Sequence, residues 1–422
     1  MPGGTWAGHA VVPRAVTPVE RHHAPRRPSR SARARPLLWA QVAVLAAGLG
    51  CVATGLLPMA EAQASMVRIA PILLFLTGVL VLAELTKQAG VFQLIAARLA
   101  WLAGGSYLAL FLLCSIFVAL VTMFLNRDTA AALLTPVLLA LAPKARIKVL
   151  PVAIMSVWLA DTASLLLPVS NLTNLLAMNR LGLSTHEFAA RMWVPQVVSL
   201  TVSMSFLWLL YWRRGRRQAD RYTPPEPERP ADRVLFGAAA LACALFVVLV
   251  LANVSVHVAA LVAVTIVVAA FAARAREKLT WGLIPWQLLI FVTGLFLVVP
   301  TLGLHGLDTM MRWLIGAEGG AEGAFRAAAA GAALSNLVIN LPAYVAGEHA
   351  LAGAGTDQLL ALLVGTNVGP IITPWASLST LIWFEYIRRH RVTISVRSFM
   401  LAGALLAAGA VPATVVALLL TT

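Results

Sequence analysis

The apolar segment 107–142 is interrupted near its middle by three adjacent polar residues, Asn126, Arg127 and Asp128. A charged side chain near the centre of a bilayer costs about 2.5–10 kcal/mol or more, so it is seldom present without a function. Polar or non-helical chain at that depth is tolerated only inside protein or beside a watery cavity. The rest of the chain must therefore fold around this segment.

The composition predicts an all-α polytopic membrane protein. Of the 422 residues, 60% are hydrophobic and 12% are charged, whereas a soluble domain has about 45–50% apolar and about 25% charged residues. The net charge of +15 comes from Lys and Arg in short segments between apolar runs, as in the pattern that sets membrane orientation. This distribution argues against nucleic-acid binding. Cys51, Cys114 and Cys243 lie in apolar runs without disulfide or metal spacing.

Four regions follow from the pattern of charge and hydropathy. Residues 1–36, rich in Arg, Pro, His and Ser, form a basic tail that we expect to be disordered and cytoplasmic. Residues 37–212 form a first membrane repeat, and the arginine-rich segment 213–233 is a cytoplasmic linker. Residues 234–422 hold a connecting span and a second membrane repeat. From apolar runs of about 20 residues we expect about 9–11 spans.

The segment 107–142 begins and ends on the same side of the membrane, because basic residues such as Lys87 and Lys144 flank both ends. Its second arm is short for a full crossing. We therefore predict a re-entrant hairpin with Asn126, Arg127 and Asp128 at its tip.

Three further apolar segments are interrupted by Pro, Asn, Ser and Thr: 150–180, 324–350 and 358–387. Proline removes a backbone donor and breaks a helix. The order of hairpin and broken helix recurs in both halves with opposite sidedness, which predicts two inverted repeats, each with a re-entrant hairpin and a discontinuous helix. The alternative is that these prolines only kink ordinary helices.

Motifs spread between residues 126 and 383 resemble the ArsB arsenite permease family. That family lies in the ion transporter superfamily, with divalent-anion/sodium symporters and NhaD-type sodium/proton antiporters. The matching residues are NRD at 126–128, LTP at 134–136, DTAS at 161–164, VSNLTN at 169–174, SN at 335–336, NLP at 340–342, GP at 369–370, TP at 373–374, SL at 377–378 and Trp383. The chain departs from the family at three positions. Arg127 separates the Asn and Asp that are adjacent in the family, Ile339 replaces an Asn, and Ala376 replaces a Gly.

The resemblance implies a secondary active transporter of a bacterial plasma membrane, which exports arsenite and antimonite in exchange for protons by alternating access. In some members an ArsA-like ATPase is a partner. A homodimer is left open. The charge pattern places the N-terminus in the cytoplasm.

The predicted substrate site consists of neutral polar side chains from the hairpins and breaks. They are Asn126, Ser170, Asn171, Asn174, Ser335, Asn336, Asn340, Asn367, Thr373 and Ser377. Arsenite is mostly an uncharged trihydroxide at neutral pH, which suits such a set of donors and acceptors. A small inorganic oxyanion, a carboxylate or a sodium ion would suit it as well, and Asn336 and Asn340 could instead only cap the hairpin arms.

Asp128 is the candidate proton carrier, with Asp161 in reserve, because desolvated carboxylates can load and release protons near neutral pH. The alternative is that Arg127 pairs with Asp128 and locks the hairpin.

Two other transporter classes share this architecture: a sodium-coupled carboxylate or anion symporter and a sodium/proton antiporter. An enzyme is disfavoured, because no zinc, Ser/His/Asp or P-loop motif is present. The sequence accordingly predicts no cofactor and no resident metal. The expected partners are the lipid bilayer, the small substrate, and protons or sodium.

Overall fold

The computed structural model describes residues 30–213, 221–225, 230–316, 319–351, 353, 355–390 and 392–421. Residues Gln41–Thr422 form one compact unit, which contains all of the helices apart from the start of α1. Most of the basic tail and parts of the linker, 214–220 and 226–229, lie outside the described residues, so their disorder stays a prediction.

All regular structure among the described residues is helical. The first half contains α1 (Arg30–Ala53), α2 (Met59–Gln88), α3 (Val91–Leu102), α4 (Tyr107–Leu125), α5 (Arg127–Lys144), α6 (Val149–Thr162), η1 (Pro168–Ser170), α7 (Leu172–Leu181) and α8 (Thr185–Leu207), which a π turn extends to Trp212. The second half contains α9 (Arg233–Leu251), α10 (Val256–Arg274), α11 (Trp286–Leu302), α12 (Asp308–Ile315), α13 (Gly320–Val338), α14 (Asn340–Ala350), α15 (Thr356–Val368), α16 (Leu378–Arg389) and α17 (Val396–Leu419).

Seven helices of the described part are long and apolar enough to cross a membrane. They comprise α2, α4, α8, α9, α10, α17 and the helix that α11 begins. This confirms a multi-pass membrane protein. The number is below the expected nine to eleven for two reasons. The first predicted span contributes only the apolar helix Gln41–Ala53 among the residues searched. The interrupted segments consist of short helices: α6 has 14 residues, α7 has 10, α15 has 13 and α16 has 12.

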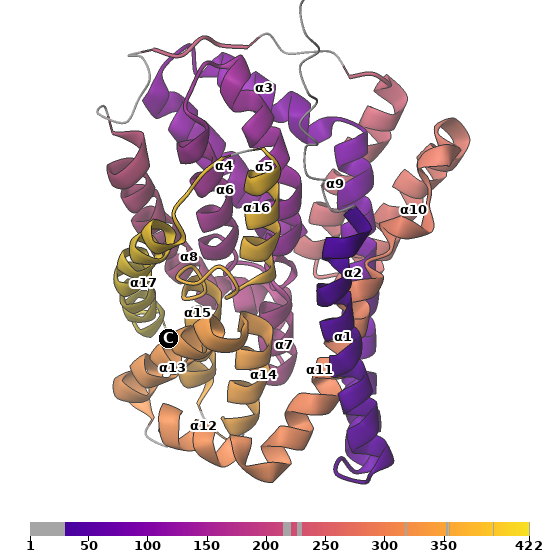
Figure 1. Cartoon of the computed structure of the whole chain (residues 1–422), viewed down its shortest axis with the longest axis vertical. Coiled ribbons are helices and arrows are strands. Elements are labelled where there is room, and N and C mark those ends of the chain that lie inside the picture. Colours follow the sequence, from indigo (N-terminus) through magenta and orange to yellow (C-terminus); the bar gives the residue numbers. More distant parts are fainter. Residues whose placement is uncertain are drawn as a thin grey trace, which may run out of the picture. The chain divides into compact units, whose positions relative to one another are not determined.

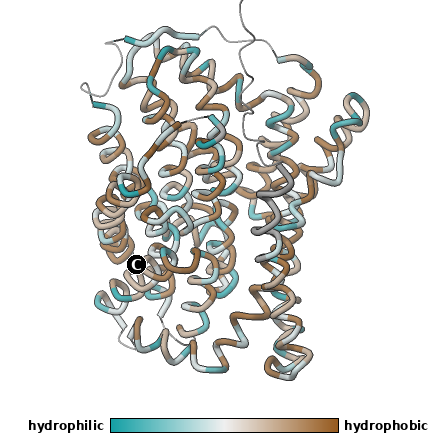
Figure 2. Tube along the Cα trace, viewed as in Figure 1, coloured by the Kyte–Doolittle hydropathy of each residue, from teal (hydrophilic) through white to brown (hydrophobic). Residues whose placement is uncertain are grey.

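The outer faces of the long helices are apolar. Hydrophobic residues follow most of their length (Figure 2), and large side chains such as Leu241, Leu401 and Leu405 are 58–61% exposed. Such a surface is suited to contact with lipid rather than with water. The polar side chains of the membrane segments lie mainly in the interior of the unit.

Two helix–turn–helix units enter the structure from opposite ends. Figure 1 shows α4 and α5 toward its upper end and α13 and α14 toward its lower end. The first turn is at Asn126, with φ 95° and ψ 143°, and the second is at Ile339, with φ 107° and ψ 146°. Both are non-glycine residues at positive φ, a conformation that normally favours glycine. The tip was predicted at Asn126, Arg127 and Asp128, but only Asn126 lies outside the helices, because Arg127 and Asp128 form the first turn of α5.

An ion pair with a buried carboxylate joins the first half to the second hairpin. Arg68 of α2 donates through Nη2 to Glu348 Oε1 of α14 at 2.5 Å, and the Glu348 side chain is 1% exposed. The neighbouring Tyr344 is also fully buried. Glu348 was not predicted as a site residue, because a glutamate near the end of an apolar segment is typical of a membrane interface.

Glycines bring the backbones of α13 and α15 into direct contact. A Cβ atom on Gly365 would lie 2.1 Å from the Ala328 carbonyl oxygen, and one on Gly331 would lie 2.9 Å from that of Leu362. Small residues at such positions allow close packing of membrane helices. The first arm of the second hairpin is therefore fixed closely against the helix that precedes the second break.

We predict that Gly365→Ala lowers stability by about 1–3 kcal/mol, because the added methyl group forces α13 and α15 apart. The melting temperature of the detergent-solubilised protein should fall by about 2–6 °C. Gly237→Ala is the matched control, since a Cβ on Gly237 of α9 meets nothing within 4 Å. Equal melting of the two variants would contradict the close contact.

Candidate functional site

The first break is closed by its own side chains. Helix α6 ends at Thr162 and α7 begins at Leu172, with only the short turn η1 between them. Asn174 Nδ2 donates to the carbonyl oxygens of Ser164 at 2.8 Å and Leu167 at 2.9 Å, and to Ser170 Oγ at 3.0 Å. Ser170 and Asn174, both predicted to bind substrate, are therefore engaged within the break in this conformation.

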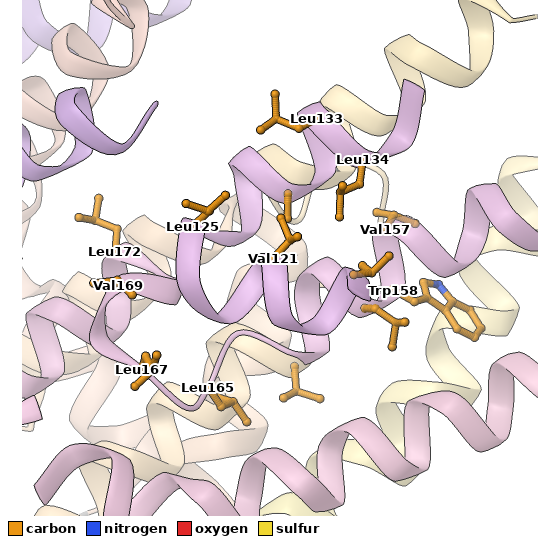
Figure 3. Packing of buried hydrophobic residues seen from close by; sticks show 14 of the residues in the cluster. Val121, Leu125, Leu133, Leu134, Val157, Trp158, Leu165, Leu167, Val169 and Leu172 are labelled. Atoms are coloured by element: carbon orange, nitrogen blue, oxygen red, sulfur yellow. The ribbon is translucent and has the colours of Figure 1, made fainter. Parts of the chain in front are cut away.

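Apolar residues surround the break on its other sides. Figure 3 shows Leu165, Leu167 and Val169 of the break in one cluster with Val121 and Leu125 of α4. This packing fixes the non-helical segment beside the first hairpin. Polar groups of the break that face this cluster need partners from within the protein.

A glutamine of α8 supplies those partners. Gln196 Oε1 accepts from the backbone N–H groups of Leu165 at 2.8 Å and Leu166 at 3.2 Å, and Nε2 donates to the Thr162 carbonyl at 3.2 Å. Ser199 Oγ donates to the same carbonyl at 2.9 Å. Helix α6 thus ends at Thr162, six residues before Pro168, which lies within the interrupted segment 150–180. Gln196 was not predicted to support the break. The sequence feature that could have indicated it is a single glutamine within a mostly apolar span.

The second break is held by Asn336 of α13. Helix α15 ends at Val368 and α16 begins at Leu378. Asn336 Oδ1 accepts from the Thr373 N–H at 2.9 Å, Asn336 Nδ2 donates to the Gly369 carbonyl at 2.9 Å, and Trp375 Nε1 donates to the Asn336 carbonyl at 2.9 Å. Asn336 and Thr373, both predicted site residues, therefore fix this hairpin to the second break.

The two breaks lie side by side and run in opposite directions. At one end, Asn367 Oδ1 accepts from Asn171 Nδ2 at 2.8 Å and from Thr173 Oγ1 at 2.7 Å, while Asn367 Nδ2 donates to Asn174 Oδ1 at 2.6 Å. The start of the second break thus contacts the end of the first. Asn171, Asn174 and Asn367 are brought together, although they come from different halves.

At the other end, the start of the first break contacts the end of the second. Asp161 of α6 is fully buried. Its Oδ1 accepts from Ser379 Oγ at 2.6 Å and Ser377 Oγ at 3.3 Å, and its Oδ2 accepts from Thr380 Oγ1 at 3.3 Å. Ser377 was predicted, whereas Ser379 and Thr380 were missed. The sequence feature that could have indicated these two residues is the run of hydroxyl side chains at the end of the second break.

Arg127 lies between two carboxylates. Its Nη2 is 3.4 Å from Asp161 Oδ1 and its Nε is 3.7 Å from Asp128 Oδ1. The Arg127 side chain is 1% exposed, and none of its three nitrogens has a hydrogen-bond partner. The Asp128 side chain is 25% exposed. Arg127 is thus within ion-pair distance of Asp128, as one alternative expected, and also of Asp161, which neither alternative included.

The remaining predicted residues lie near the hairpin turns. Asn126 Oδ1 accepts from the Asp128 N–H at 3.0 Å and so caps α5. Asn340 is buried beside the second turn, where its backbone N–H donates to the Ala376 carbonyl at 2.9 Å. Ser335 Oγ donates to the Gly331 carbonyl of its own helix at 2.7 Å. The substrate-binding assignments of these residues stay predictions.

The described residues contain no group of three or more His, Cys, Asp or Glu side chains that could hold a metal ion. The polar centre is instead built from amides, hydroxyls and one cluster of three charged groups. Paired interrupted helices in the two halves of a membrane protein are the arrangement that secondary transporters use for their binding sites. The fold and site thus define a multi-pass secondary transporter.

Sequence comparison identifies the family. Residues 34–377 match the citrate transporter (CitMHS) family, and the chain belongs to that family. It is a transporter family and not an enzyme family. The predicted resemblance to ArsB-type transporters is confirmed by the curated relatives. The arsenical pump membrane protein of Escherichia coli (strain K12) is 28% identical over 340 residues, which cover 75% of this chain and 79% of that protein.

Two further relatives extend the comparison. The putative arsenical pump membrane protein of Bacillus subtilis (strain 168) is 25% identical over 355 residues, covering 75% of this chain and 79% of that protein. An uncharacterised transporter of Mycobacterium tuberculosis is 25% identical over 362 residues, which cover 80% of this chain and 82% of that protein. Among solved structures, the Alcanivorax borkumensis YdaH transporter has a similar fold, with a TM-score of 0.54 and 15% sequence identity. The match covers 85% of this chain and 86% of that chain.

We predict that Gln196→Met destabilises the protein by about 1–3 kcal/mol, because the backbone N–H groups of Leu165 and Leu166 lose their partner. The Thr162 carbonyl keeps Ser199 as a partner. Thermal melting of the purified protein measures this loss. Val197→Met is the control, since Val197 is the next residue of α8 and is 52% exposed. If both variants melt together, Gln196 does not support the break.

Proposed function

We propose that this secondary transporter exports arsenite and antimonite in exchange for protons. The arsenical pump relatives of Escherichia coli and Bacillus subtilis, which are 28% and 25% identical to this chain, support this substrate class. The charge of the polar centre also supports it, and this is the observation on which the proposal chiefly rests.

The only charged side chains described at the crossing of the breaks are Arg127, Asp128 and Asp161. With both carboxylates ionised, their formal charges (+1, −1 and −1) sum to −1. A polyanion such as citrate would be repelled by this centre in a medium of low dielectric constant. A neutral trihydroxide can exchange hydrogen bonds with the surrounding Asn, Ser and Thr side chains without adding charge. The centre therefore favours an uncharged substrate.

The two halves form inverted repeats in this proposal, 37–212 and 234–422, joined through a cytoplasmic linker at 213–233. The similar turns at Asn126 and Ile339 support it, as does the antiparallel course of the two breaks. Each hairpin would enter the membrane part-way from its own side and turn back. The N-terminus would lie in the cytoplasm of a bacterial cell.

Asp128 is the proposed proton carrier. Its side chain is 25% exposed, and its Oδ1 has no hydrogen-bond partner. Asp161 is sealed from solvent, and its oxygens accept bonds from three hydroxyl groups. Asp128 is therefore better placed than Asp161 to exchange a proton with the site.

The description of the family as citrate transporters favours one alternative, a sodium-coupled carboxylate symporter. Sodium-dependent uptake of citrate or a dicarboxylate into intact cells would identify it. A sodium/proton antiporter would instead alkalinise everted vesicles when sodium is added without arsenite. Arsenite efflux driven by a proton gradient requires neither an ArsA-like ATPase nor a homodimer.

The test is arsenite transport in everted membrane vesicles that contain the protein. A proton gradient, acid inside, should drive arsenite and antimonite accumulation, and a protonophore should abolish it. Expression should also raise the arsenite resistance of a sensitive bacterial host. Vesicles that accumulate no arsenite under this gradient would exclude the proposed substrate.

We predict that Asp128→Asn abolishes proton-driven arsenite accumulation in these vesicles, with at least a tenfold lower initial rate, while the protein remains folded. The change removes the titratable group but keeps its shape. Glu61→Gln is the control, because Glu61 is an exposed carboxylate in the first turn of α2. A wild-type rate in Asp128→Asn would remove Asp128 from proton coupling.

A further inference from the structure

The Asp161 carboxylate, which lies 3.4 Å from Arg127 Nη2, belongs to a cluster of oxygen atoms. Asp161 supplies two carboxylate oxygens, and Ser377, Ser379 and Thr380 supply three hydroxyls. Ser377 Oγ lies 2.7 Å from Ser379 Oγ and 2.9 Å from Thr380 Oγ1. The five oxygens thus form a compact group next to the positive charge.

A second carboxylate completes this environment. Asp128 lies on the Nε side of the guanidinium, at 3.7 Å, while Asp161 lies on the Nη2 side, at 3.4 Å. Carboxylate and hydroxyl oxygens at the interrupted helices of a transporter are typical ligands of a small hard cation. The chemistry around Arg127 is therefore that of a cation site.

The contacts of Arg127 to the two carboxylates are ion pairs that are longer than ordinary charge-assisted hydrogen bonds. All three of its side-chain nitrogens are buried and without a hydrogen-bond partner, so its contacts to the two carboxylates are contacts between charges. Two carboxylates that both lie within 4 Å of one guanidinium would repel each other without the positive charge between them. Arg127 thus performs the electrostatic task that a bound ion performs elsewhere.

We propose that Arg127 is a tethered substitute for a coupling cation, so that its guanidinium permanently fills a site that would otherwise recruit sodium. This inference rests on the proposed proton-coupled function and extends it. A site already occupied by part of the chain cannot load and release a metal cation in each cycle. The wild-type protein is therefore indifferent to sodium, and removal of the guanidinium creates a site for a free cation.

The test is the melting temperature of the purified full-length protein in 100 mM NaCl, LiCl, KCl or choline chloride. The wild type should melt at the same temperature in all four salts. Arg127→Ala should melt lower in choline chloride, and sodium or lithium should raise its melting temperature by about 5 °C relative to choline. Arg397→Ala is the control, because Arg397 is an exposed arginine in the first turn of α17.

A second variant separates a specific cation site from a general salt effect. The double variant Arg127→Ala/Asp161→Asn should lose the sodium response, because the cluster no longer contains the Asp161 carboxylate. Sodium stabilisation of the wild type would overturn the inference. So would an Arg127→Ala protein that is indifferent to all four salts, or one that remains unfolded in all of them, because a sodium ion must be able to replace the guanidinium.

Melting measures neither arsenite nor transport, so it fails separately from the proposed function. If arsenite is not the substrate, the cation response of Arg127→Ala is still expected. If the wild type exchanges arsenite for protons but Arg127→Ala gains no cation response, only the inference about Arg127 is wrong.

Discussion

The absence of water in the hydrocarbon region requires every backbone polar group there to find a partner within the protein. This requirement is most severe where a helix is interrupted. At the first break the partners are Asn174 from the following helix and Gln196 from α8, and at the second break the partner is Asn336 from the hairpin. These amides take the place of water as hydrogen-bond partners, and they allow the interrupted backbone to lie in the polar centre of the helix bundle.

The sequence predicted the interruptions better than the contacts between them. Apolar runs, Asn126 and the Pro-containing segments indicated where helices end, because those effects act between neighbours in the chain. The bond between Ser379 and Asp161 joins residues 218 positions apart, and Gln196 reaches Thr162 across 34 positions. No local pattern states which hydroxyl faces which carboxylate, so Ser379, Thr380 and Gln196 were missed. The same reason explains why Arg127 was considered only beside its neighbour Asp128.

The two hairpins share a backbone conformation but differ in chemistry. At the first turn, Asn126 tolerates positive φ relatively well, and charged residues follow it. At the second turn, Ile339 adopts a similar φ although its β-branched side chain disfavours it. A neighbouring bond, from the Asn340 N–H to the Ala376 carbonyl, helps to fix that turn. One fold element thus carries charges in the first half and serves as a neutral clamp in the second.

The antiparallel pairing of the breaks also has a consequence for biosynthesis. Asn174 meets its partner Asn367 only after another 193 residues have been made, which takes roughly 10–40 s at about 5–20 residues per second. During that interval the first break must be stable without the second half. Gln196 lies only 31 residues beyond Leu165, so α8 can satisfy the exposed backbone soon after it leaves the ribosome. Gln196 can therefore bond the backbone of the first break during synthesis, before the second half of the chain is made.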